Sequence, residues 1–205
     1  MNSEPDQKTF CIDCTLPSNL CICSLAPKLP LDIDTHILFH PRELHRRNSS
    51  GRLLKHCLNI PSSQWHRLKN ADQAAQFQGY ALLYPDDNKQ NNPNGALKLN
   101  DKDTQDVKGY LWLDATWQES RKMMRQSPWL DALPKYAITS HLTTDRSGSQ
   151  YKLRRNQTKQ GLSTIETFAC WLGEQNQAKS AQDLLNFFNL FQNTFLNARN
   201  SGLFK

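Results

Sequence analysis

Four cysteines lie close together near the start of the chain and have the spacing of metal ligands. Cys11 and Cys14 form a Cys-x-x-Cys pair, and Cys21 and Cys23 follow after six intervening residues. Four thiolates this close in sequence can surround one tetrahedral Zn²⁺, and a site filled by four sulfurs keeps no open position for catalysis. A redox pair or unrelated buried thiols are the alternatives, but a redox Cys-x-x-Cys normally opens a helix within a βαβ unit. We therefore predict a structural zinc module over residues 1–30.

The clearest pattern for chemistry is the turn Asp114-Ala-Thr116-Trp117. It follows an apolar run at 110–113 that predicts a buried strand, and it precedes a basic helix. Proteins with α/β sheets place ligands at the carboxyl ends of such strands, so Asp114 can act there as a general base or orient a reacting group. The simpler alternative is that Asp114 or Thr116 caps the following helix.

A second turn, Ser163-Thr164-Ile165-Glu166, has the spacing of a capping box. The backbone N–H groups exposed at such a helix start can bind a carboxylate or a phosphate. Arg154 and Arg155 precede this turn. The pattern fits RNA phosphates, a small anionic ligand, or only a solvated, capped helix.

Positive charge is concentrated in two windows of the chain. Residues 39–56 hold five basic and one acidic residue, and residues 121–159 hold nine basic and two acidic ones. Clustered positive charge is typical of proteins that bind nucleic acids, with a solvated surface as the alternative. The arginines that we expect to contact RNA are Arg46, Arg52, Arg121, Arg125, Arg154 and Arg155.

Apolar runs of strand length alternate along the chain with patterns of helical period. We predict strands at 36–39, 80–84, 110–113 and 136–139. Helices are predicted after a cap at Asn48 or Ser49, over 117–126, after Ser163 and across the apolar stretch 184–195. This alternation favours an α/β sheet with parallel pairs of strands.

The composition excludes membrane-spanning and exported proteins. The chain has 205 residues, a formal net charge of +6 and 38% hydrophobic residues. No stretch approaches the roughly 18 consecutive apolar residues of a membrane span, and the first ten residues do not resemble a signal peptide. We expect a cytoplasmic protein with reduced cysteines, no membrane association and no obligatory protein partner.

Five segments, in order, resemble the DTW-domain family. They are Cys11-x-x-Cys14-x-x-Pro17 with Cys21-x-Cys23; Leu38-x-His40-Pro41-x-Glu43 with Asn48 and Gly51-Arg52-Leu53-Leu54; Leu83-Tyr84-Pro85; Leu113-Asp114-x-Thr116-Trp117; and Tyr151-x-Leu153-Arg154 with Leu162-Ser163-Thr164-Ile165-Glu166. The resemblance spans residues 11 to about 170. Its specificity comes from the ordered set, since no single segment would suffice.

The resemblance implies a tRNA-uridine aminocarboxypropyltransferase. Such enzymes move the 3-amino-3-carboxypropyl group of S-adenosylmethionine to N3 of a tRNA uridine and release methylthioadenosine. The implied fold over residues 31–205 is a SPOUT-like, mostly parallel α/β sheet with a C-terminal knot, and it follows the zinc module.

The resemblance also implies roles for residues of both turns. Asp114 is the candidate base, and Thr116 and Trp117 would shape the pocket around it. The residues implied in cofactor binding are Leu83, Tyr84, Pro85, Leu113, Ser163, Thr164 and Glu166. Arg154 would meet either a tRNA phosphate or the carboxylate of the cofactor.

Two other functions remain open from the sequence. A zinc-ribbon protein that binds RNA without catalysis needs only the cysteines and the basic windows, but it does not explain the carboxylate turn. A SPOUT RNA methyltransferase would use the same cofactor and transfer a different group.

Overall fold

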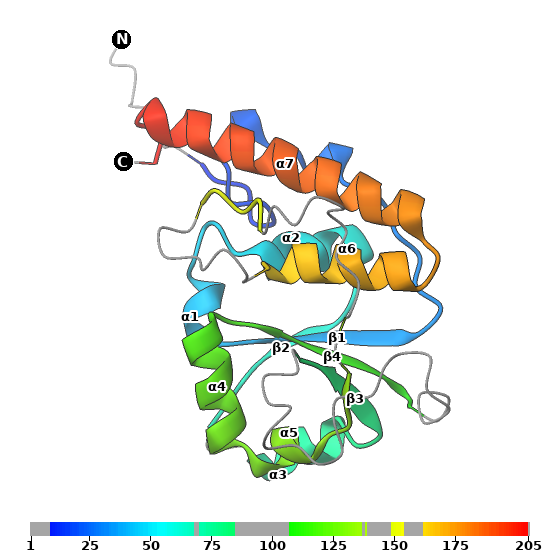
Figure 1. The fold of residues 1–205 in the computed structure, drawn as a ribbon. Coiled ribbons are helices and arrows are strands. Elements are labelled where there is room, and N and C mark those ends of the chain that lie inside the picture. The colour runs from blue at the N-terminus through cyan, green and yellow to red at the C-terminus, as the bar shows by residue number, and fades with distance from the viewer. Residues whose placement is uncertain are drawn as a thin grey trace.

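A parallel sheet forms the centre of the molecule. This computed structural model describes residues 9–67, 70–84, 107–136, 138, 149–153 and 162–204, and its strand order is β2-β1-β4-β3-β5 (Figure 1). The strands are β1 (Asp34–Phe39), β2 (Ser62–Gln64), β3 (Tyr80–Leu83), β4 (Gly109–Asp114) and β5 (Lys135–Tyr136). Every described pair of neighbouring strands is parallel. The predicted α/β class with a parallel sheet is therefore confirmed.

Helices cover both faces of this sheet (Figure 1). One face carries α2 (Ser50–Leu58) and α6 (Thr164–Glu174), with α7 (Ala178–Asn200) packed on their outer side, and the other carries α3 (Asn70–Gln76), α4 (Trp117–Gln126) and α5 (Pro128–Ala132). The central strands alternate between two cores. Ile37 and Trp112 belong to the core that includes α2 and α6, whereas Leu38 and Leu111 belong to the core that includes α4 and α5. Nearly continuous apolar runs are the pattern of parallel strands buried on both sides.

The predicted helices form where the sequence places them. Helix α4 covers the predicted residues 117–126, and Ser49 and Ser163 cap α2 and α6. The fourth predicted strand is seen only as β5, which begins one residue early, and residues 137 and 139 lie outside the described part of the chain. The short elements that were not predicted include α1 (Pro41–Leu44), β2, α3 and α5.

The cysteine-containing segment packs on the same core as α2, α6 and α7. Two short 3-10 helices, η1 (Ser18–Leu20) and η2 (Cys23–Leu25), organise it. Leu16, Ile22 and Leu29 are buried in that core. The hydrophobic core of this segment is thus continuous with that of the residues that follow.

The predicted knot depends on the path between β5 and α6. Most of that path, residues 139–148 and 154–161, lies outside the described residues. In the part of the chain that the structure describes, no helix combines the length and the apolar character needed to span a bilayer.

Candidate active site

The two central strands, β1 and β4, end side by side. Phe39 pairs with Asp114 in the parallel register. The chain leaves β1 through α1 and α2 toward β2 on one side of the sheet, and it leaves β4 through α4 and α5 toward β5 on the other. Figure 1 shows α1 and α4 at this shared edge. Open parallel sheets bind their ligands where the connections diverge in this way.

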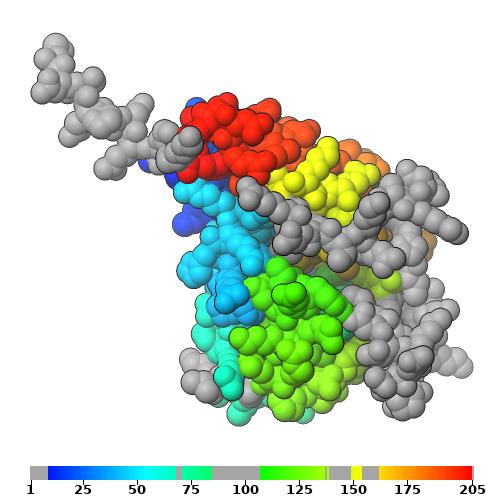
Figure 2. Space-filling model, turned by 60° about the vertical axis from the view of Figure 1, so that its left-hand side comes forward, coloured from blue at the N-terminus to red at the C-terminus, as the bar shows by residue number. Residues whose placement is uncertain are grey.

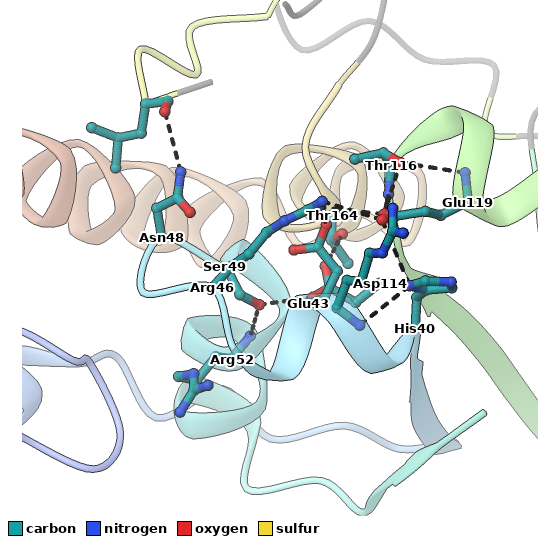
Figure 3. Close-up of polar contacts among 12 residues, drawn as sticks. His40, Glu43, Arg46, Asn48, Ser49, Arg52, Asp114, Thr116, Glu119 and Thr164 are labelled. Atoms are coloured by element: carbon teal, nitrogen blue, oxygen red, sulfur yellow. Dashed lines mark hydrogen bonds and ion pairs between the residues drawn. The ribbon is translucent and has the colours of Figure 1, made fainter. Parts of the chain in front are cut away.

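Asp114, the last residue of β4, joins three elements at this point. Its side chain is fully buried, its Oδ2 accepts a hydrogen bond from Ser49 Oγ at 2.8 Å, and its Oδ1 accepts one from Thr164 Oγ1 at 2.6 Å (Figure 3). Ser49 caps α2, and Thr164 is the first residue of α6. The carboxylate therefore fixes the starts of two helices to the end of the central strand.

Gly51 allows the carboxylate to come this close to α2. A Cβ at this position would lie 2.4 Å from Asp114 Cγ. Any side chain at residue 51 would therefore displace the carboxylate from its two hydroxyl donors.

Thr116, and not Asp114, caps α4. The Thr116 hydroxyl accepts from the Glu119 N–H, while Glu119 Oε2 accepts from the Thr116 N–H at 2.9 Å and the hydroxyl at 2.7 Å. This capping box leaves the Asp114 side chain to its contacts with Ser49 and Thr164. The cap predicted as one alternative for Asp114 is therefore wrong for Asp114 and correct for Thr116.

Glu119 continues into an ion-pair network with α1 (Figure 3). Arg46 donates to Glu119 Oε1 at 3.1 Å and also to Glu43, which is fully buried. Burial would raise the pKa of the Glu119 carboxyl, but the hydrogen bonds from Thr116 and the nearby Arg46 hold that pKa below its usual range. Arg46, predicted to contact RNA, thus has its guanidinium engaged by two carboxylates.

His40 lies at the end of β1, next to this network. Its Nδ1 accepts from the Arg42 N–H at 3.3 Å, and its ring stacks on Trp65 with centroids 5.8 Å apart. Burial lowers the pKa of the imidazole, Glu119 opposes that shift, and Arg42 and Lys122 add to it. The sequence offered two signals for this residue, its place directly after a buried strand and its place in the second DTW-like segment, but neither assigns it a role.

Of the predicted cofactor residues, those at the ends of β3 and β4 share the edge with Asp114. Tyr84 stacks on Trp117 with ring centroids 5.5 Å apart. Trp117 is 42% exposed, whereas Leu83 is buried and Leu113 half-buried. Pro85 lies outside the described residues.

The predicted turn at the start of α6 has the expected capping box. Glu166 Oε2 accepts from the Ser163 N–H at 2.7 Å, and its Oε1 accepts from the Gln150 N–H at 2.7 Å. Glu166 therefore holds the segment 149–153 against α6. Through Thr164 this turn is joined directly to Asp114.

The remaining predicted arginines differ in their surroundings. Arg52 donates to the backbone carbonyls of Ile12 and Leu44, which ties α2 to the cysteine-containing segment. Arg121 and Arg125 are exposed on α4. Arg154 and Arg155 lie outside the described residues.

The four predicted zinc ligands come together. The Sγ atoms of Cys11 and Cys23 are 3.6 Å apart, those of Cys14 and Cys21 are 3.8 Å apart, and all four lie within 4.8 Å of one another. A tetrahedron with Zn–S bonds of about 2.3 Å places its sulfurs about 3.8 Å apart. The cluster therefore fits one Zn²⁺, and its four thiolates would complete the coordination.

One family comparison covers nearly the whole chain. A family model described as the DTW domain matches residues 8–196, a range that includes both turns and all four clustered cysteines. No solved structure gives a significant match. Because the match extends over far more than half of its length, the chain belongs to the DTW-domain family.

Proposed function

We propose that this protein transfers the 3-amino-3-carboxypropyl group of S-adenosylmethionine to N3 of a tRNA uridine, with methylthioadenosine as the second product. Membership in the DTW family, which comprises tRNA-uridine aminocarboxypropyltransferases, supports this proposal. The structural observation that carries it is Asp114, which links the end of β4 to the turn that begins α6. Two turns that the sequence singled out separately are thus parts of one site.

The sulfonium of S-adenosylmethionine activates each of its three attached carbons, so the pocket must select which carbon meets the acceptor. We propose that Leu83, Tyr84, Pro85 and Leu113 bind the adenosine part. Ser163, Thr164 and Glu166 would complete the cofactor site. The Ser163-Thr164 turn would help to hold the adenosine part, and the backbone N–H groups at the start of α6 suit the carboxylate of the methionine part. Thr116 and Trp117 would shape the acceptor side of the pocket.

Asp114 has two conceivable roles, as a general base or as an orienting group. Its full burial and its two hydroxyl donors favour orientation of Thr164 and Ser49. Thr164 is half-buried whereas Ser49 is buried, so of the two hydroxyl donors we assign contact with the substrate to Thr164. If Asp114 takes the N3 proton, we propose that Thr164 Oγ1 accepts it while passing its own proton to Asp114.

The remainder of the fold is also part of the proposal. We propose a SPOUT-like arrangement with a C-terminal knot over residues 31–205 and a structural zinc module over residues 1–30. The parallel sheet and the position of α6 beside the ends of β1 and β4 support the first, and the sulfur spacing supports the second.

Nucleoside mass analysis tests the reaction. The purified protein is incubated with S-adenosylmethionine and an unmodified tRNA transcript, and the digested nucleosides are compared with a reaction that lacks the cofactor. We expect a uridine whose mass has risen by one aminocarboxypropyl group. A uridine that gains only a methyl group, or no new nucleoside, would reject the proposal.

A further inference from the structure

Charge is sorted between the inside and the outside of α1 and α4. The segments 41–47 and 117–126 contain two acidic side chains, Glu43 and Glu119, and both are buried against Arg46. The exposed charged side chains of these two segments are all positive: Arg42, Arg47, Arg121, Lys122 and Arg125. Both carboxylates of these segments are thus turned inward onto Arg46, and the charges left on the outside are cations.

The exposed face of α4 combines an aromatic ring with these cations. Trp117, Arg121 and Arg125 follow at intervals of four residues, so they line one side of the helix. Each interval advances about 6 Å along the helix axis, which is close to the separation of neighbouring phosphates along a nucleic-acid strand. Trp117 is 42% exposed and is supported from one side by Tyr84.

Helix α1 extends this surface beside α4. Figures 1 and 2 show the two helices next to each other. Arg42 of α1 and Lys122 of α4 both lie close enough to His40 to lower its pKa, so their charges converge at the shared end of β1 and β4. We call the set of Arg42, Trp117, Arg121, Lys122 and Arg125 the α1–α4 face.

We infer that the α1–α4 face binds an unpaired segment of RNA, with Trp117 stacking on one base and the four cations contacting the phosphates. This inference rests on the proposed function, because the RNA concerned is the tRNA that carries the target uridine. A base can stack on Trp117 only if it is unpaired, and stacking tolerates any base because every base has a π face. The face therefore favours single strands over duplexes and places the strand beside the Asp114 turn.

An acidic protein partner would use the cations but would not need an exposed, supported indole at the end of their row. The nucleobase of the cofactor would use the indole but not a row of cations that extends along α4. An unpaired RNA strand uses both features together.

The test compares matched variants of the full-length protein in binding an unmodified tRNA transcript and a single-stranded oligoribonucleotide. The double variant Arg121→Gln, Arg125→Gln should bind RNA with a weaker dependence on salt. The magnitude of the slope of log K against log salt should fall by roughly 0.7 for each phosphate that the variant no longer neutralises. Lys179→Gln with Arg199→Gln on α7 removes the same charge from exposed positions elsewhere and should leave that slope unchanged. If the α4 and α7 double variants reduce the magnitude of the slope equally, RNA binding depends only on the total charge of the protein, and the inference is wrong.

Trp117 variants test stacking. Trp117→Ala should weaken binding of the single strand by about 5- to 150-fold, and Trp117→Phe should restore most of that affinity. Binding of the duplex formed with the complementary strand should change little. If Trp117→Ala instead weakens S-adenosylmethionine binding and leaves RNA binding unchanged, the ring belongs to the cofactor and the inference is wrong.

The same variants separate this inference from the proposed function. Wild-type protein that modifies tRNA, with no effect of the α1–α4 variants on RNA binding, would overturn the inference alone. Wild-type protein that modifies no tRNA, but whose RNA binding depends on these residues as described, would overturn the proposed function alone.

Discussion

At the scale of single residues, the site is built by partners that are distant in the sequence. Ser49 and Thr164 are 65 and 50 residues from Asp114. The sequence predicted Asp114 from its place after an apolar run and Thr164 from its capping box. It contained no signal that the two side chains meet, because that contact depends on how α6 packs over the sheet.

Asp114→Ala is expected to lower transfer by at least 10²-fold, in the range typical of a positioned catalytic group. It should also lower stability, since the Ser49 and Thr164 hydroxyls would lose a buried acceptor, at about 1–3 kcal/mol for each unsatisfied group. Single-turnover transfer and urea unfolding measure the two effects on the same variant. Asp114→Asn retains the shape of the side chain. Its free energy of unfolding should stay close to that of wild type, whereas its transfer activity should still be strongly reduced.

Thr164 variants are the control for this prediction. Thr164→Ser keeps the hydroxyl and should retain transfer, whereas Thr164→Val removes it at nearly constant volume and should not. Normal transfer by Asp114→Ala would remove the carboxylate from the mechanism.

At the scale of elements, capping boxes and apolar periods were the reliable signals. The boxes that begin α4 and α6 can be recognised as Thr-x-x-Glu and Ser-x-x-Glu. The elements that were not predicted, such as α1 and β2, have four and three residues, too few to show a period. They form because the central sheet and its neighbouring helices hold them.

The link between α1 and α4 predicts different behaviour for two arginines that sequence reasoning grouped together. Arg46→Gln should destabilise the protein by more than the ~1 kcal/mol of an exposed ion pair, because it removes the guanidinium that the buried Glu43 and Glu119 share. It should change the salt slope of tRNA binding little.

Arg121→Gln, the matched variant on α4, should do the opposite. Its free energy of unfolding should be close to that of wild type. The magnitude of the slope of log K for tRNA against log salt should fall by roughly 0.7 to 0.9. Urea unfolding and filter-binding titrations over a range of salt measure both quantities. A reversal of the two patterns would reject the assignment of Arg46 to the internal network.

At the scale of the whole molecule, the four-cysteine cluster and the sheet share one core. Metal analysis should give about one zinc per chain, and a strong chelator should lower the melting temperature because Leu16 and Ile22 lie in the main core. Cys14→Ser should lose the metal. Cys57→Ala, at a buried cysteine outside the cluster, should keep it. A chain free of metal that melts like the untreated protein would contradict this prediction.

Buried histidines predict how stability depends on pH. Burial lowers the pKa of His36, and Asp34 only partly opposes that shift. The folded protein then binds the proton less readily than the unfolded chain, whose histidines titrate near 6.5. The contribution of His36 to the free energy of unfolding is therefore fully present above pH 6.5. It is lost as the pH falls from there toward the lowered pKa of the folded protein.

His36→Gln tests this contribution. The glutamine amide can still bond to Ser63, whose Oγ lies 2.9 Å from His36 Nε2, but it does not titrate. Urea unfolding at pH 7.5 and at pH 5.5 should show a smaller loss of stability for the variant than for wild type. Both proteins carry the same four-cysteine cluster, so any acid sensitivity of that cluster cancels in the comparison. An equal or larger loss in the variant would show that His36 does not contribute.

The most direct measurement of the central claim follows two carbons of S-adenosylmethionine. Unmodified tRNA is incubated with the protein and cofactor labelled in the carboxyl carbon, and in parallel with cofactor labelled in the S-methyl carbon. We predict that the carboxyl label enters tRNA, that the methyl label remains in methylthioadenosine, and that Asp114→Ala suppresses the transfer. Methyl label in tRNA, or no label in tRNA from either cofactor, would contradict the assignment.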